Sequence, residues 1–145
     1  MKEKKVTLPQ QKMREIIFEI LYTYEFQSGS DEELIALMMK EHKISKRHIL
    51  NALSMVKTIQ ENQKILDEYI QKVSHDYSLE RIQTVERTIL RLCVYEILVA
   101  KTIPEKVGIS EAKRLARKFS TPDAARFVHG IIDGLISDKG KLIDV

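Results

Sequence analysis

Hydrophobic residues recur along most of the chain at intervals of three and four positions, which is the pattern of helices with one buried face. No segment alternates between apolar and polar residues as a half-buried strand would. The sequence therefore predicts an all-α fold of about six or seven helices. We expect one domain over residues 1–145, with a basic, flexible start at residues 1–10 and a frayed tail at residues 138–145.

Capping residues and prolines mark where several of these helices begin and end. Ser30 opens a capping-box pattern for a short helix that ends near His42. A longer helix follows Ser45, and two glutamines in its apolar stripe weaken its middle, so the pattern allows a break there. The last helix is expected to have Thr121 as its cap and Pro122 at its first position.

The first helix, near residues 13–26, is apolar on two faces. Its second stripe consists of Phe18, Tyr22 and Phe26, each four positions after the previous one. Such a helix is either enclosed on both sides within the domain or presents one face to a partner. If it meets a partner, Tyr22 is the best candidate contact, because a tyrosine has an apolar ring and a polar tip.

The segment TVERTILRLCVYEILV, residues 84–99, is almost continuously apolar and yet carries four charges. Apolar positions surround most of its helical wheel, which predicts a central helix packed on several sides. Glu86 lies in the first turn, where either the helix dipole stabilises its carboxylate or the side chain meets a partner chain. Five positions share one narrow arc, which we interpret as a solvated edge: Thr84, Arg87, Thr88, Arg91 and Tyr95.

Composition agrees with a globular protein of modest positive charge. Of the 145 residues, 43% are hydrophobic and 31% charged, and the formal net charge is +3. The single cysteine, Cys93, cannot form an internal disulfide and is expected in the core. No apolar run approaches the roughly 20 residues that span a bilayer, and the polar start does not resemble a secretory signal. We therefore expect a cytoplasmic protein without membrane contact.

Enzyme motifs are absent from the sequence. It contains no HExxH, no glycine-rich phosphate loop and no nucleophile elbow. His129 and Asp133 share a helical face, but two ligands do not make a zinc site. Gly130 and Gly134, one turn apart, are expected to let another helix approach closely. The sequence predicts no catalysis, no metal and no cofactor.

Basic residues gather in two regions, either of which is a solvated surface or a phosphate-binding surface. The first region is the start of the chain, and the second is the segment EAKRLARKFS, residues 111–120. The members are Lys2, Lys4, Lys5, Lys12 and Arg14 in the first, and Lys113, Arg114, Arg117 and Lys118 in the second.

Three segments resemble, in order and spacing, the motifs of the NusB family of bacterial transcription antitermination factors: RIQTVERTILRLCVYEIL, IPEKVGISEA and FSTPDAARFVHGIIDGL. The opening RE and LYTYEFQ are similar to the first helix of that family, so the resemblance covers essentially the whole chain. It implies two small helical bundles packed across each other. It also implies a partner protein, the ribosomal protein NusE, and a single-stranded RNA ligand, the boxA element of ribosomal RNA operons. Together they would help the transcription elongation complex read through terminators.

The resemblance also assigns expected contacts. Glu86 in VER corresponds to an acidic NusE contact of the family, and Tyr22 is our second candidate contact with a partner protein. An exposed Phe127 could stack on an unpaired base, and Asp123 either accepts hydrogen bonds from a base or stabilises the helix start. The expected RNA contacts are Lys2, Lys4, Lys5, Lys12, Lys106, Asp123, Arg126 and Phe127.

The chain departs from the family pattern at its start, which has few arginines, and at Ser120 and His129, where the family usually has glycine and asparagine. These departures concern RNA affinity more than the fold. We predict that Lys113 and Arg114 provide an extra RNA contact that compensates for the missing arginines. The alternatives are a protein-interaction scaffold with little RNA affinity and, less favoured, an enzyme module. A homodimer is a further alternative, because some family members self-associate over the RNA surface.

Overall fold

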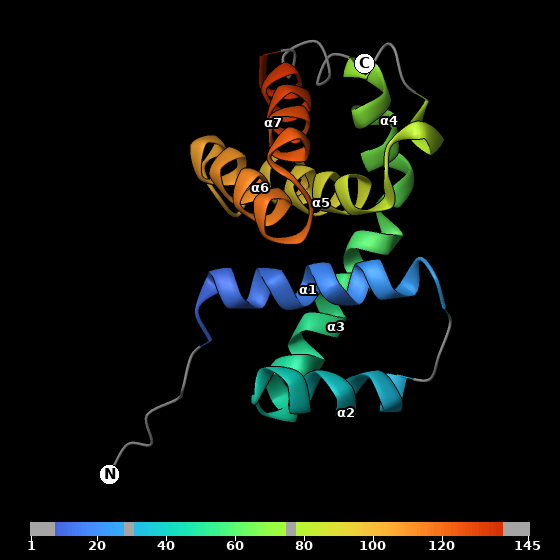
Figure 1. Ribbon diagram of the computed structural model, residues 1–145, viewed down its shortest axis with the longest axis vertical. Coiled ribbons are helices and arrows are strands. Elements are labelled where there is room, and N and C mark those ends of the chain that lie inside the picture. The colour runs from blue at the N-terminus through green and yellow to red at the C-terminus, as the bar shows by residue number, and fades with distance from the viewer. Residues whose placement is uncertain (1–7, 28–30, 75–77, 138–145) are drawn as a thin grey trace. The chain divides into compact units, whose positions relative to one another are not determined.

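The computed structural model describes residues 8–27, 31–74 and 78–137, and in these ranges it consists of helices and connecting turns without strands (Figure 1). The all-α prediction is thereby confirmed. The proposed cap Ser30 and both chain ends lie outside the described residues. The elements are α1 (Gln10–Tyr24), α2 (Asp31–His42), α3 (Lys46–Glu61), α4 (Gln63–Val73), a 3₁₀ turn η1 (Leu79–Arg81), α5 (Thr84–Val94), a π-helical segment η2 (Tyr95–Val99), α6 (Glu105–Phe119) and α7 (Pro122–Ser137).

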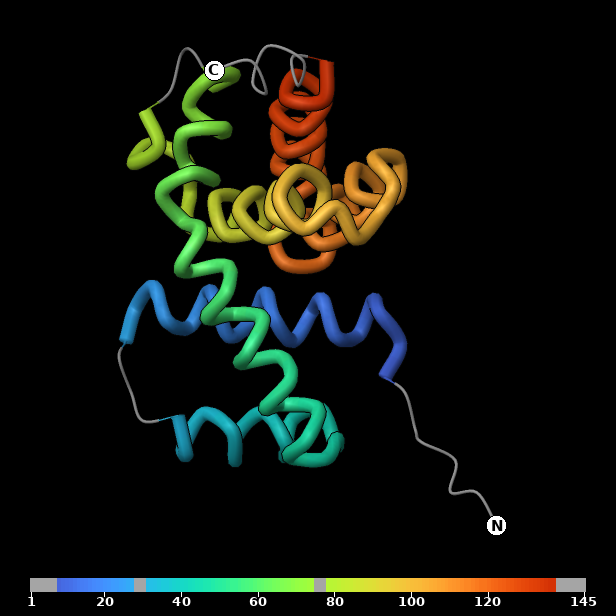
Figure 2. The backbone as a smooth tube through the Cα atoms, turned by 180° about the vertical axis from the view of Figure 1, so that it is seen from behind, coloured from blue at the N-terminus to red at the C-terminus, as the bar shows by residue number. Residues whose placement is uncertain are grey.

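The chain divides into two compact units, residues 1–57 and 58–145. In the first unit, α3 runs across α1 and α2, as the front and back views both show (Figures 1 and 2). Polar contacts connect α1 to α2. The Tyr24 hydroxyl donates a 2.5 Å hydrogen bond to Asp31, and Nε2 of His42 lies 2.5 Å from Oε2 of Glu19. Burial and the Asp31 carboxylate raise the pKa of Tyr24 to about 12, so its hydroxyl stays protonated and remains a donor.

In the second unit, α5 is the central helix, as its sequence predicts. It packs against α4, α6 and α7, and every residue from Thr88 to Val94 is buried. Cys93 is among them and is fully buried, as expected of a small core residue. The helices α4 and α7 lie side by side in both backbone views (Figures 1 and 2).

The prediction of a solvated edge on α5 is wrong. Thr88, Arg91 and Tyr95 are all buried, and Thr84 and Arg87 are half-buried. The buried charge is tolerated because Asp67 on α4 lies opposite Arg91. Nε of Arg91 donates to Asp67 at 2.8 Å and an Nη at 3.1 Å, a bidentate pair between two helices.

Two helix irregularities shape the chain. The predicted break in the long central segment occurs at Asn62, whose side-chain amide donates to the Thr58 carbonyl at 2.8 Å. Before Pro104, where the sequence predicts a stop, α5 first widens into η2, and the Ala100 amide bonds to the Tyr95 carbonyl at 2.8 Å. The left-handed backbone of Lys101, with φ of 54°, then ends the helix.

Of the two glycines expected to allow a close approach, only Gly134 does so. A Cβ at Gly134 would lie 3.3 Å from Cγ1 of Val73 on α4. Gly130 has nothing within 4 Å of such an atom, so the prediction for it is wrong. The close approach that the sequence did not reveal is at Gly108 on α6, where a Cβ would collide with Ile97 of η2.

Candidate nucleic-acid and partner interfaces

Local capping chemistry fixes the start of α7, where three of the expected RNA contacts lie. The Thr121 hydroxyl accepts a 3.0 Å hydrogen bond from the Ala124 amide, and Pro122 is the first helical residue, as the sequence predicts. Asp123, Arg126 and Phe127 therefore occupy the first two turns of one helix. The structure brings these three together.

Charge and exposure differ among these three residues. Asp123 and Arg126 form an ion pair with each other, and their side chains remain 84% and 73% exposed. An exposed pair of this kind adds little stability, so a ligand could replace either partner at small cost. Phe127 is half-buried, which leaves part of its ring accessible. This group offers an anion, a cation and an aromatic surface within two helical turns.

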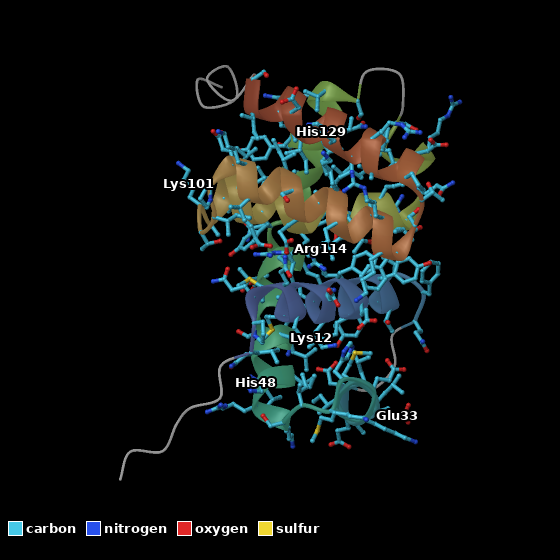
Figure 3. The ribbon with its side chains drawn as sticks, turned by 60° about the vertical axis from the view of Figure 1, so that its left-hand side comes forward. Lys12, Glu33, His48, Lys101, Arg114 and His129 are labelled. Carbon is cyan, nitrogen blue, oxygen red and sulfur yellow. The ribbon has the colours of Figure 1, made fainter. Side chains whose placement is uncertain are left out.

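Lys106 lies apart from that group. It is exposed in the first turn of α6, two positions after the Pro104 cap, whereas Asp123 follows the other end of the same helix. The intervening stretch of α6 is about 20 Å long at 1.5 Å per residue. Lys12 is half-buried in the first turn of α1, in the first unit of the chain (Figure 3). The expected contacts Lys2, Lys4 and Lys5 lie outside the described residues.

The two residues predicted as an extra RNA contact have different surroundings on α6. Arg114, labelled in Figure 3, donates to both carboxylate oxygens of Glu111, at 2.7 and 3.1 Å. Glu111 is buried, with a side chain 5% exposed, and this guanidinium helps to balance its charge. Lys113 is half-buried and forms no ion pair within the described part of the chain. The spacing of Glu111 and Arg114, three positions apart, could have indicated this pair from sequence.

Glu86 has a structural partner as well as an accessible side. It is the third residue of α5, and its carboxylate accepts a hydrogen bond from the backbone N–H of Gln83, the residue that caps the helix. Partial burial raises the pKa of Glu86, and the Gln83 hydrogen bond opposes that shift. The side chain is half-buried. Its helix-start role is therefore present in the structure, and a partner contact remains compatible with it.

Arg87, beside Glu86, is the residue near this site whose structural importance the sequence did not reveal. Its guanidinium donates to the carbonyls of Leu79 and Ile82, at 3.3 and 3.2 Å. These bonds fasten the η1 turn to the start of α5. The backbone around Glu86 is held in place by its neighbour.

The second apolar stripe of α1 forms a ladder of three rings. Phe18 and Tyr22 stack with centroids 5.8 Å apart, and Tyr22 meets Phe26 edge-on at 4.9 Å. Exposure increases along the ladder: Phe18 is buried, Tyr22 is half-buried and Phe26 is 64% exposed. The stripe is therefore enclosed at one end and open at the other, a combination of the two arrangements that the sequence allowed.

The described residues offer neither a metal site nor a membrane-spanning helix. Among the described residues, no group of three or more histidine, cysteine, aspartate or glutamate side chains is placed to hold a metal ion. No helix in the same residues is both long enough and apolar enough to cross a membrane. The candidate surfaces are thus the start of α7, the exposed face of α6 and the accessible parts of α1 and α5.

A family model described as the NusB family matches residues 11–137 of the chain. The match includes every helix of the structure except the first residue of α1. The chain belongs to the NusB family. The resemblance carried by the three motifs is thereby confirmed.

Relatives in this family cover most of the chain. The transcription antitermination protein NusB of Chlamydia pneumoniae is 35% identical over 131 residues, which are 90% of this chain and 82% of the relative. The same protein from Pseudothermotoga lettingae is 35% identical, covering 84% and 86%. The solved T. maritima NusB has a TM-score of 0.77 at 32% identity, covering 92% and 94%. A crystal structure of the antitermination factors NusB and NusE in complex with dsRNA gives a TM-score of 0.73 at 25% identity, covering 87% and 94%. The NusB fold of this chain is therefore shown by both sequence and structure.

Proposed function

We propose that this protein is a transcription antitermination factor that binds boxA-type RNA together with the ribosomal protein NusE. The observation that carries the proposal is the NusB family match over residues 11–137, joined to the likeness to a solved NusB–NusE–dsRNA complex. In this function the protein catalyses nothing. It presents surfaces to RNA and to NusE within the transcription elongation complex, in the cytoplasm.

The start of α7 supports an RNA-binding role. Phe127 supplies a ring on which an unpaired base can stack, and stacking is the usual way in which proteins hold single-stranded RNA. Arg126 supplies a cation for phosphate, and Asp123 an acceptor for base amino groups once their mutual pair opens. Lys106, Lys12, Lys2, Lys4 and Lys5 add phosphate affinity, which depends on salt.

Two further residues, one in each unit of the chain, are proposed as NusE contacts. Glu86 has a half-buried carboxylate at the start of α5, and Tyr22 lies in the partly open ring ladder of α1. A carboxylate of this kind suits an arginine or lysine of a basic ribosomal protein. Tyrosine combines an apolar ring with a hydroxyl, which suits the edge of an interface.

A titration tests the proposal. Labelled boxA RNA is titrated with the protein alone, with NusE alone and with both, and binding is followed by gel shift. We expect the pair to bind more tightly than either protein, and a scrambled RNA to bind more weakly. Equal affinity for boxA and scrambled RNA in the presence of NusE would refute specific boxA recognition. Light scattering on the free protein shows whether it is a monomer or a homodimer.

One observation favours a second candidate, a protein-interaction scaffold with little RNA affinity. Two of the cations expected to meet RNA are already paired with carboxylates, Arg114 with Glu111 and Arg126 with Asp123. The same titration separates the two functions. A scaffold would bind NusE and show no tighter RNA binding in its presence.

A further inference from the structure

Three cations stand in one line on the exposed side of α6. Lys106, Lys113 and Arg117 are separated by seven and four positions, so at 100° per residue they fall within an arc of about 40°. The buried residues Ala112 and Leu115 lie on the other side of the helix. At 1.5 Å per residue, the line extends for about 16 Å along the helix. We call these three residues the α6 row.

The charges of the α6 row are available to a ligand. Within the described residues, Lys106, Lys113 and Arg117 form no ion pair, in contrast to Arg114, whose guanidinium is held by buried Glu111. Exposed Ser110 lies between them and adds no charge. The positive potential of the helix is therefore concentrated along one line.

The neighbouring cation Lys118 belongs to another side of the helix. It lies about 100° from Arg117 around the helix axis, and its Nζ is 5.8 Å from the centroid of the Phe119 ring. Both Arg117 and Lys118 are in the last turn of α6, where any cation interacts favourably with the helix dipole. The helix dipole therefore stabilises Arg117 and Lys118 alike. It does not explain why Lys106, Lys113 and Arg117 lie along one line.

We infer that the α6 row is a phosphate track, along which the backbone of single-stranded RNA passes between the start of α6 and the start of α7. A line of cations on one side of a helix fits a polymer whose phosphates follow one another along its backbone. The track also joins two places already expected to meet RNA, Lys106 at one end and Phe127 beyond the other. The inference rests on the proposed function, because it assigns a path to the RNA that this function requires.

The track revises the extra contact predicted from sequence. Lys113 remains in it and Arg117 joins it. Arg114 leaves it, because its guanidinium is already paired with the buried carboxylate of Glu111. Membership of the track thus depends on the helical face of each cation and on whether a carboxylate already pairs with it. It does not depend on adjacency in the sequence.

Counterion release makes the track measurable. For a single strand, each phosphate contact adds about 0.7 to the slope of log affinity against log salt concentration. Fluorescence anisotropy with a labelled single-stranded boxA RNA, in the presence of saturating NusE, gives that slope. We expect Arg117→Gln to lower it by about 0.7 and the double variant Lys113→Gln with Arg117→Gln to lower it by about 1.4.

Lys118→Gln is the matched control. It removes the same charge from the same helical turn and leaves the row intact, so its slope should equal that of the unmodified protein. Circular dichroism and NusE binding should be unchanged in all variants, because the altered side chains of the row are not in the core.

The outcomes separate the track from the proposed function. If the unmodified protein with NusE does not bind boxA RNA, the proposed function fails and the track fails with it. If it binds and the double variant keeps the original slope, the track alone is refuted. Equal losses for Arg117→Gln and Lys118→Gln would also refute it, since general charge would then explain the effect.

Discussion

Replacing Asp67 by asparagine tests the contact that anchors the central helix. Asp67 on α4 receives two hydrogen bonds from Arg91 on α5, and their side chains are 21% and 10% exposed. Asparagine has nearly the same shape as aspartate but no charge. The variant therefore isolates the electrostatic part of the connection between the two helices.

The size of the effect follows from burial and geometry. Removing one partner of a buried ion pair typically costs about 3–5 kcal/mol, because the remaining charge is left in a poorly solvated place. Asparagine keeps one acceptor, and water can reach the exposed fifth of the site, so we expect the lower end, about 3 kcal/mol. At about 2–4 °C per kcal/mol for a protein of this size, the melting temperature should fall by roughly 10 °C.

Urea denaturation followed by far-ultraviolet circular dichroism measures the free energy of unfolding. The control is Lys57→Met, which breaks the exposed pair of Lys57 with Asp31, whose atoms lie 3.9 Å apart and whose side chains are 65% and 48% exposed. That change should cost less than about 1 kcal/mol. The two variants each remove one ion pair and differ in its burial.

Equal stability of the two variants would refute the reasoning. It would mean that Arg91 finds adequate solvation without the Asp67 charge, and that packing alone fixes α5 against α4. A loss of RNA or NusE binding without a loss of stability in Asp67→Asn would likewise contradict a structural role for the pair.

Further predictions concern the candidate surfaces and the helix glycines. Glu86→Lys should weaken NusE binding measured by calorimetry, whereas Glu86→Gln should keep the helix start. The folded-state pKa of Glu86 is raised above its ordinary value of 4.5, so its stabilising contribution is present below that value and is lost as pH rises through the folded pKa. Glu86→Gln should therefore become more stable relative to the unmodified protein as pH rises in urea titrations. A difference in unfolding free energy that does not change with pH would contradict this. Phe127→Ala should reduce RNA affinity in the gel shift by about 1–3 kcal/mol, and an unchanged affinity would exclude base stacking. Gly108→Ala should destabilise by about 1–3 kcal/mol through the collision with Ile97, while Gly130→Ala, in an open helical position, should stabilise by about 0.5–1 kcal/mol; thermal melts with the opposite order would contradict the packing.

Local chemistry explains what could be predicted from the sequence. Thr121 and Pro122 mark the start of α7, and the break at Asn62 follows from the weakened apolar stripe. The helix predicted to end near His42 also ends at that residue. Each of these features depends on residues within one or two turns of each other. The three motifs also identify the family, because their order and spacing can be read directly from the sequence.

The tertiary structure decided which charges are buried and which remain available. Periodicity placed Arg91 on a polar arc, but Asp67, 24 positions away on another helix, makes that arc part of the interior. Periodicity likewise put Gly130 and Gly134 on one face, and only the packing of α4 distinguishes them. A sequence fixes the direction in which a side chain leaves its own helix. What it meets depends on the rotation and placement of the neighbouring helices, which are set by the packing of the whole core.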